Sequence, residues 1–416
     1  MNRSVFYPFV LLLMFVLSHA ASAQQRIVIS GKVSGAQTGE GISHASVSIQ
    51  NKGIGTGTNE AGQYILLIPQ ANFNDTLSIS CIGFDTKRIP VAGLKNEQVL
   101  DITLAKSTIE LMEVTITHYN AVKIMQKAIA RIPENNINQP HLLRGFYRMY
   151  TLKNNAPLQL SEAVFDVFNF GYGDKRADLF RLIKARNEKN VPDFSSLEFG
   201  QKPNTIFEQD IVNHLPACGF LNEEGLERHE YEVNGIVDVN GQDCFQLEFK
   251  EKAAQTKDTY RGVMYIDTKT YAFIGFDYGL SPAGLKVPAK NNFVLKSLIG
   301  IDGVGLKIAG DRMRVNYQKV NNKWVLASVE GTDTVAVSGP APKNNFTAQI
   351  KFNYQITTVD TNESPFESTM GRNESINNYK SSGGERFWKD YNILLSDYNV
   401  DDILKQIQTI NKGKTS

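Results

Sequence analysis

Near its N-terminus the chain alternates apolar and polar side chains in short runs separated by Gly, Asn and Asp residues. The apolar members are Ala45, Val47, Ile49, Leu77, Ile79, Cys81, Ile102 and Leu104. Side chains two apart lie on one face of a β-strand, so each run has one face to bury and one to expose. The turn residues between the runs allow tight reversals. The pattern predicts a seven-stranded β-sandwich over residues 24–106.

The stretch from Gly55 to Tyr64 is a Gly-rich turn that ends in an aromatic residue, and the motif Leu77–Phe84 follows it. No helix pattern follows these glycines, so they shape turns and do not form a phosphate loop. The order of these motifs resembles the carboxypeptidase-regulatory-like domain. That domain is a transthyretin-like sandwich common on secreted and outer-membrane proteins of Bacteroidota. The resemblance implies a place in the cell envelope and no particular activity.

A β-branched segment, Ile109–Thr117, comes after the sandwich. It resembles the segment that follows the same domain in SusC-like TonB-dependent transporters. About 300 residues remain after it, with no plug pattern, and the last residues are Lys414-Thr415-Ser416 where an outer-membrane barrel ends on an aromatic. We therefore expect a linker strand, which together with the next helix fills residues 107–140.

The first 23 residues have the features of a secretory signal peptide. Arg3 precedes an apolar run from Val5 to Leu17, and Ala21-Ser22-Ala23 supplies small residues for cleavage. The run is shorter than the roughly 18 residues that a membrane-spanning helix needs. We expect an exported protein that begins near Gln24 and has no transmembrane segment in its mature form.

Charge and cysteine content limit the possible partners. Without residues 1–23 the chain has 43 basic and 43 acidic side chains, which does not favour nucleic acid as a partner. Its three cysteines are Cys81, Cys218 and Cys244. Cys81 and Cys244 lie in strand patterns, which favours buried thiols. A disulfide between Cys218 and Cys244 stays open at this point.

An amphipathic helix is predicted after the linker strand. Its apolar stripe consists of Ala121, Ile124, Met125, Ala128, Ile129 and Ile132. Thr117 is the expected N-cap, and Pro133 is expected to end the helix. Lys123, Lys127 and Arg131 form a basic line on another face, which we interpret as an ordinary solvated face.

Residues 141–365 return to strand patterns. Alternating runs on both sides of Asn240-Gly241 predict a β-hairpin, and further pairs are expected around 268–270 and 321–322. Consecutive hairpins build an antiparallel β domain. The run Gly262–Phe273 resembles strands of the curved half-barrels in lipoprotein-carrier proteins, so a half-barrel is one expected form of this domain.

Residues 366–416 are predicted to form a C-terminal tail. A short amphipathic helix is expected from Val400 to Ile407, with Asp401 and Asp402 in its first turn. The motif Phe387-Trp388-Lys389-Asp390-Tyr391-Asn392 resembles a C-terminal signature of uncharacterised Bacteroidota proteins that carry the same sandwich. That family supplies no activity. The predicted fold class is thus mainly β: a sandwich, a connecting helix, a larger antiparallel domain and a tail.

No catalytic, cofactor-binding or metal-ligating residue can be assigned from the sequence. The five histidines outside the signal peptide lack the spacing of a zinc site, and no nucleophile elbow is present. Acidic neighbours such as Glu223-Glu224 are typical of solvated segments. We therefore expect a non-enzymatic periplasmic or outer-membrane protein, which binds a protein partner through the sandwich or an apolar or lipid ligand in the second domain. The alternative is a hydrolase of envelope polymers whose carboxylates the fold brings together.

Overall fold

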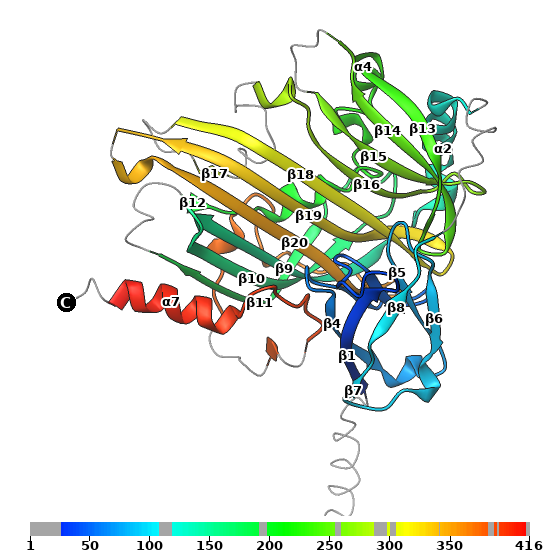
Figure 1. Ribbon diagram of the computed structural model, residues 1–416, viewed down its shortest axis with the longest axis horizontal. Helices are drawn as coiled ribbons and strands as arrows, with labels where there is room; N and C mark the ends of the chain where they lie inside the picture. The colour runs from blue at the N-terminus through cyan, green and yellow to red at the C-terminus, as the bar shows by residue number, and fades with distance from the viewer. Residues whose placement is uncertain are drawn as a thin grey trace, which may run out of the picture.

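The computed structural model consists of a β-sandwich, one large β-sheet and a C-terminal tail that ends in a helix (Figure 1). The predicted signal peptide, residues 1–23, and the predicted linker strand, residues 109–117, lie outside the described residues. The described residues are 26–107, 119–190, 198–253, 259–286, 298–299, 305–340, 342–381, 387–388 and 391–412.

The sandwich is built from two four-stranded sheets. One has the order β4-β1-β7, with β8 also paired to β1, and the other has the order β3-β2-β5-β6. The sandwich has eight strands where the sequence predicts seven, because its last extended segment is interrupted at Leu100 and Asp101 and forms two short strands that both run parallel to β1. The eight strands are β1 (Arg26–Gly35), β2 (Ser46–Ile49), β3 (Gly55–Gly57), β4 (Gln63–Pro69), β5 (Thr76–Ser80), β6 (Lys87–Pro90), β7 (Gln98–Val99) and β8 (Ile102–Leu104).

The predicted alternation in β2 and β5 is confirmed. Val47, Ile49, Leu77 and Ile79 are at most 1% exposed and fill the sandwich core. Because successive side chains of a strand point to opposite faces, the intervening serines point away from that core. This outer face of β2 and β5 consists of Ser46, Ser48, Ser78 and Ser80, and we call it the serine face.

Helix α2 (Ala121–Asn135) carries the predicted apolar stripe, with Ala121, Ile124, Met125, Ala128 and Ile132 buried. Asn120 is its N-cap and accepts a hydrogen bond from the Lys123 amide at 2.9 Å. The expected cap, Thr117, lies outside the described residues. The prediction that Pro133 ends the helix is wrong. Pro133 lies inside the last turn of α2. There its missing N–H costs a single helical hydrogen bond, to the Ile129 carbonyl.

Two members of the basic line on α2 have partners. The Lys127 ammonium lies 3.8 Å from the centre of the Tyr271 ring, and Arg131 forms an exposed ion pair with Glu134. Such contacts are common on exposed helix faces, and the third member, Lys123, is also exposed. The interpretation as an ordinary helix face therefore agrees with these contacts.

The large sheet is antiparallel and open, with the order β11-β10-β9-β20-β19-β18-β16-β15-β14-β13. The predicted turns at Asn240-Gly241 and Asn321-Asn322 are confirmed, and all four residues adopt the left-handed φ values that such turns require. The mainly β fold class is thereby confirmed. Its strands are β9 (His141–Lys153), β10 (Ala156–Asn169), β11 (Leu179–Lys189), β13 (His229–Val239), β14 (Gln242–Glu251), β15 (Tyr260–Asp267), β16 (Phe273–Leu280), β18 (Gly305–Val320), β19 (Lys323–Ser338) and β20 (Phe346–Asp360).

One face of this sheet, the inner face, packs against α2 and the segment between β11 and β13. That segment contains α3 (Pro203–Phe207) and α4 (Glu223–Arg228), and next to it β12 (Glu198–Phe199) pairs with β17 (Leu298–Ile299). Buried side chains of the segment are Phe199, Ile206, Phe207, Ile211, Val212, Phe220 and Leu221. They join the main hydrophobic core, so the chain itself fills this face.

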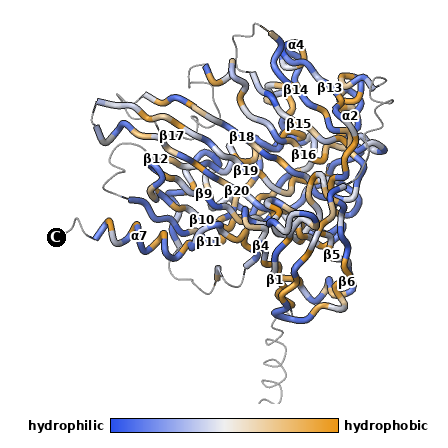
Figure 2. The backbone as a smooth tube through the Cα atoms, in the orientation of Figure 1, coloured by the Kyte–Doolittle hydropathy of each residue, from blue (hydrophilic) through white to orange (hydrophobic). Residues whose placement is uncertain are grey.

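The opposite, outer face carries the sandwich on one part and the tail on another. The tail ends in α7 (Val400–Lys412), which lies against β10 and β11 (Figure 1). Ile403 and Ile407 of α7 pack on Tyr150 and Leu160 of the sheet. The helix alternates hydrophobic and hydrophilic residues along its length (Figure 2), as the sequence predicts for an amphipathic helix.

The three cysteines are free thiols. Cys218 and Cys244 are buried, and Cys81 is half-buried. The disulfide left open by the sequence is therefore not formed. Burial raises the pKa of the Cys218 and Cys244 thiols well above the usual range, so neither is a reactive thiolate at neutral pH.

Candidate functional site

A polar chamber of about 790 Å³ lies between the sandwich and the outer face of the large sheet. Its sandwich wall is the serine face together with Gly55 and Gly57 of β3. Its other wall comes from strands β18, β19 and β20, with Asn316, Ser328 and Gln355 among the lining residues. A volume of this size lies within the range of roughly 300–1,000 Å³ that small-molecule sites occupy.

The chamber exists because the sandwich wall carries small side chains, whereas the wall of the large sheet carries longer polar ones such as Arg314, Asn316 and Gln355. Strand registers place Gly57, Ser46 and Ser80 in one row and Gly55, Ser48, Ser78 and Arg88 in the next. Packed β-sheets lie about 10 Å apart, and large apolar side chains usually fill the gap. Glycine and serine do not reach across it. The space that remains is lined by hydroxyl and amide groups.

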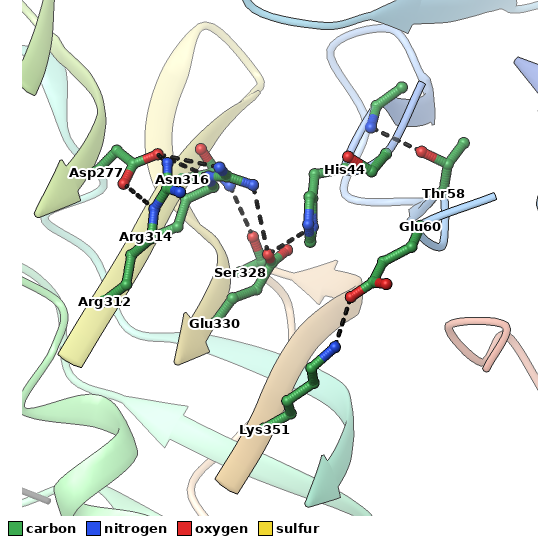
Figure 3. A network of polar contacts seen from close by, with 12 residues as sticks. His44, Thr58, Glu60, Asp277, Arg312, Arg314, Asn316, Ser328, Glu330 and Lys351 are labelled. Carbon is green, nitrogen blue, oxygen red and sulfur yellow. Dashed lines mark hydrogen bonds and ion pairs between the residues drawn. The ribbon is translucent and has the colours of Figure 1, made fainter. Parts of the chain in front are cut away.

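One end of the chamber is closed by a chain of charged groups (Figure 3). His44 of the sandwich places Nδ1 2.7 Å from Glu330 Oε2. Arg314 lies between the two sheet carboxylates, 3.8 Å from Glu330 and 3.0 Å from Asp277. Arg312 adds a two-pronged contact to Asp277, at 2.7 and 2.8 Å. The two domains therefore meet here through the His44–Glu330 contact, which the ion pairs of the large sheet extend.

Both carboxylates at this end are held in the ionised form. Burial by itself would raise the pKa of Glu330, but the hydrogen bond from His44 and the charge of Arg314 outweigh it, and the pKa is lowered. For Asp277, burial is likewise outweighed by Arg312 and Arg314, so its pKa is also lowered. A carboxylate that stays ionised accepts hydrogen bonds and does not serve as a general acid.

The side of the chamber next to the β13–β14 hairpin is closed by two hydrogen bonds. Ser80 donates to Asn240 Oδ1 at 2.5 Å, and Thr86 donates to Asp238 Oδ1 at 2.9 Å. Gly241, in the same turn, has a φ of +74°, and the Arg88 guanidinium lies where a Cβ atom of residue 241 would be. A glycine is thus needed there both for the turn and for the close approach of Arg88.

The opposite end of the serine face leads to solvent. Gln50, Lys52 and Asn74 line the chamber there and are exposed. The β18–β19 turn forms the other lip, where the Asn322 amide donates to Asn51 Oδ1 at 2.9 Å. The chamber is therefore closed near His44 and open near Lys52.

The tail ties the sandwich to the sheet, and we call its described residues from 387 to 412 the strap. The Asn392 side chain accepts from the Leu67 amide at 2.7 Å and donates to the Leu67 carbonyl at 3.2 Å. Trp388 packs against Phe146, with the Arg186 guanidinium 4.7 Å from the centre of its ring. The C-terminal motif found in the sequence thus serves as a contact to both parts of the molecule.

A row of polar side chains crosses the outer face from β16 to β11. Cross-strand partners follow in the order Asp277, Arg314, Glu330, Asn353, Arg148, Glu162 and Arg186. Glu162 is fully buried and pairs with Arg148 and Arg186. The Asn353 amide group, in the middle of the row, is buried without a hydrogen-bond partner among the described residues. The row therefore joins the strap-covered part of the face to the sandwich-covered part.

Besides Asp277 and Glu330, the fold brings a second pair of carboxyl groups together, those of Asp311 and Asp333. They face each other across β18 and β19 on the inner face, and Asp333 is fully buried. Burial first, and then the charge of Asp311, raises the pKa of Asp333 well above its usual range. Because Asp333 has no exposed surface, this pair does not form an open hydrolytic site.

The remaining sequence candidates do not converge on one site. His229 is buried and its Nδ1 lies 2.8 Å from the Gly225 carbonyl, while Glu223 is in the first turn of α4. In the part of the chain that the structure describes, no three His, Cys, Asp or Glu residues are placed to hold a metal ion. The same part contains no helix that is both long enough and apolar enough to span a membrane.

Residues 29–116 match the family model of the CarboxypepD_reg-like domain. The match confirms the resemblance that the sequence indicates for the sandwich. The narrower resemblances, to SusC-like transporters and to an uncharacterised Bacteroidota family, stay predictions. No curated protein matches the chain.

Three solved structures are similar to part of the chain. A DUF1329 family protein from Desulfovibrio piger is 14% identical with a TM-score of 0.23, and covers 60% of this chain and 96% of its own. A LolA superfamily protein from Nitrosomonas europaea is 8% identical, with a TM-score of 0.21 and coverages of 59% and 96%. A chain of the MucA/MucB complex of Pseudomonas aeruginosa is 10% identical with a TM-score of 0.19, and covers 59% of this chain and 100% of its own. Likenesses this remote do not identify a function.

Proposed function

We propose that this protein is a non-enzymatic binding protein of the cell envelope that holds a polyhydroxylated ligand, such as a short saccharide, in the chamber between its two domains. The observation that carries the proposal is the chamber itself, which is open to solvent and lined by hydroxyl and amide groups. Polar groups that face one another across a gap need partners, which are either water or a ligand.

The form of the chamber walls favours a saccharide over a peptide. The walls are faces of sheets, and β2 lies between β3 and β5, so its backbone groups are already paired. A peptide that adds to a sheet needs a free edge. A hydroxyl-rich ligand needs only side chains, and the serine face offers these.

An apolar ligand in the second domain has less support. The inner face of the large sheet is the surface on which a half-barrel would hold such a ligand. Here Phe207, Phe220 and Leu221 of the same chain occupy that surface. We therefore place the ligand at the outer face, where the lining is polar.

The hydrolase alternative also has less support. Glycoside hydrolysis uses one carboxyl group with a raised pKa as acid and one as nucleophile or base. Asp277 and Glu330 both have lowered pKa values. Asp277 is engaged by arginines of its own sheet, and Glu330 is engaged by His44 of the sandwich, which supports binding as the role of the chamber.

The proposed location rests on the predicted signal peptide and on the sandwich family, whose members are common on exported proteins. Both features support a protein in the periplasm as well as a protein at the inner face of the outer membrane. A saccharide ligand fits both, because envelope polymers contain such units.

The proposal can be tested with purified protein lacking residues 1–23. Maltotriose and the trimer of N-acetylglucosamine serve as hydroxyl-rich probes, and a fluorescent fatty acid serves as the apolar probe. Binding is followed by calorimetry and by amide hydrogen exchange in β2 and β5. We expect a saccharide to bind and to protect these strands, and the fatty acid not to bind.

A variant that fills the chamber decides where binding occurs. Ser48→Phe places a ring in the chamber and should abolish saccharide binding, while Ser34→Phe, on β1 and outside the chamber lining, should not. Fatty-acid binding that Ser48→Phe leaves unchanged would favour the inner face and overturn the proposal. Circular dichroism shows whether each variant is folded.

A further inference from the structure

The acidic groups of the chamber are not free to receive hydrogen bonds from a ligand. Its acids are already engaged: Asp277 by two arginines, Glu330 by His44 and Arg314, and Asp75 by the Asn72 amide at 2.8 Å. A bound molecule therefore finds few free carboxylates to which it can donate.

The serine face contributes hydroxyls that are available to a ligand. The side-chain hydroxyls of Ser46, Ser48 and Ser78 make no hydrogen bond to any other described residue. These three residues line the chamber, so their hydroxyls can both donate to and accept from a ligand.

Basic side chains stand at the edges of the same space. Arg88 lies directly across from Ser78 on β6, Lys52 is at the open end, and the Lys319 ammonium lies 5.2 Å from the centre of the Trp324 ring. Within the described ranges none of these three cations has an ion-pair partner. This contrasts with the closed end, where every charge is paired.

Resting on the proposed function, we propose that the ligand is an anionic saccharide, with hydroxyls on the serine face and its acidic group near Lys319. Hydroxyls that both donate and accept suit the hydroxyls of a saccharide, and cations without acid partners select a negatively charged ligand. A carboxylate of a uronic acid and a phosphate of a sugar phosphate share this chemistry.

The test compares matched probes by calorimetry. Trigalacturonate is the carboxylate probe, glucose 6-phosphate is the phosphate probe, and maltotriose is the neutral probe. We expect an anionic probe to bind at least about tenfold more tightly than maltotriose, and its affinity to fall with rising salt because the charges are partly exposed. Which anionic probe binds more tightly identifies the acidic group.

Two variants distinguish this inference from a general charge effect. Lys319→Gln keeps a hydrogen-bonding side chain and should lower the affinity for the anionic probe about tenfold, with no change for maltotriose. Lys307→Gln removes a charge from the same strand, outside the chamber lining, and should change neither.

The possible failures separate the two proposals. If maltotriose binds as tightly as the anionic probes and Lys319→Gln has no effect, the anionic inference is wrong and the proposed function stands. If no saccharide binds, or if Ser48→Phe leaves binding unchanged, the proposed function is wrong as well.

Discussion

The two faces of the large sheet are buried in opposite ways. The inner face is covered by a segment of the same domain, and its contacts are aromatic, such as Phe220 stacked on Phe249 with ring centres 4.4 Å apart. The outer face carries a row of alternating charges and is covered by two separate parts, the sandwich and the strap. The inner cover leaves a filled core, whereas the outer cover leaves a chamber.

This difference follows from the forces that act on each face. Apolar burial has no preferred direction and favours close packing. Ion pairs and hydrogen bonds require particular geometries, so Arg148 with Glu162, or His44 with Glu330, fix the position of a cover without filling the space beside it. We infer that the inner face supplies most of the stability and the outer face positions the ligand site.

The largest expected effect comes from the inner face. Phe220→Ala removes a ring that is 2% exposed and contacts Phe249 and Tyr278. Loss of buried apolar surface, together with the cavity left behind, should lower the free energy of unfolding by about 4 kcal/mol. Denaturant unfolding measures it, with Ile183→Ala, at an exposed position, as the control. A loss below about 1 kcal/mol would mean that the segment does not form part of the core.

The outer row should respond to the loss of a charge partner. Arg148→Met leaves Glu162, which is fully buried, with Arg186 alone, and we expect a loss of about 3 kcal/mol. Adding Glu162→Leu to this variant should recover part of the loss, because the uncompensated charge is then absent.

The exposed ion pair of Arg176 and Asp174 gives the matched comparison for this second prediction. Arg176→Met should cost far less than Arg148→Met, since surface pairs contribute little. Equal effects at both sites, measured by the same denaturant titration, would argue against burial of the row.

The sequence predicts which side chains share a face of a strand, but it does not predict which residues of another sheet pack against that face. The alternation that buries Val47 and Ile79 also turns Ser46 and Ser80 outward. This was predictable, because side chains in a strand alternate between its two faces. The contact of His44 with Glu330 joins residues 286 positions apart, and only the packing of the sandwich on the large sheet, together with the strand registers within each, brings them together. Local patterns contain no information on such register between distant strands. The chamber was therefore not predictable.

The C-terminal motif shows the same limit. Its aromatic residues and the helix at residue 400 indicate a tail with a surface to bury. Which surface it covers depends on Phe146 and Leu67, which belong to two different parts of the fold. Pro133 shows a limit of a different kind, because a proline in the last helical turn costs only one hydrogen bond and packing of the apolar stripe outweighs it.

The inner face also contains the buried carboxyl pair of Asp311 and Asp333, and removing one of these charges should stabilise the protein. The pKa of Asp333 is raised in the folded state, so the folded protein holds a proton that the unfolded chain releases above about pH 4. Stability from this group is full below that pH and is lost as pH rises through the folded-state pKa. Asp333→Asn should therefore gain about 1–2 kcal/mol at neutral pH.

The pH profile separates this third prediction from a general effect of removing a charge. The gain from Asp333→Asn should grow between pH 5 and pH 8 when melting temperatures are compared. Asp243→Asn, at a side chain that is 54% exposed, should show no such growth. A gain independent of pH would mean that the pKa of Asp333 is not raised in the folded protein.

The smallest expected effect concerns the strap. Because the strap covers part of the outer face only, a change in it tests whether the two faces contribute separately to stability. Asn392→Ala removes both side-chain hydrogen bonds to the Leu67 backbone, and we expect a loss of about 1 kcal/mol. Because the inner core is untouched, the change should be local: the Leu67 amide should exchange faster with solvent while amides of β14 and β15 keep their rates. Asn373→Ala, in an exposed turn, serves as the control. Faster exchange throughout the large sheet would show that the strap supports the whole fold, and the separation between a stabilising inner face and a positioning outer face would then fail.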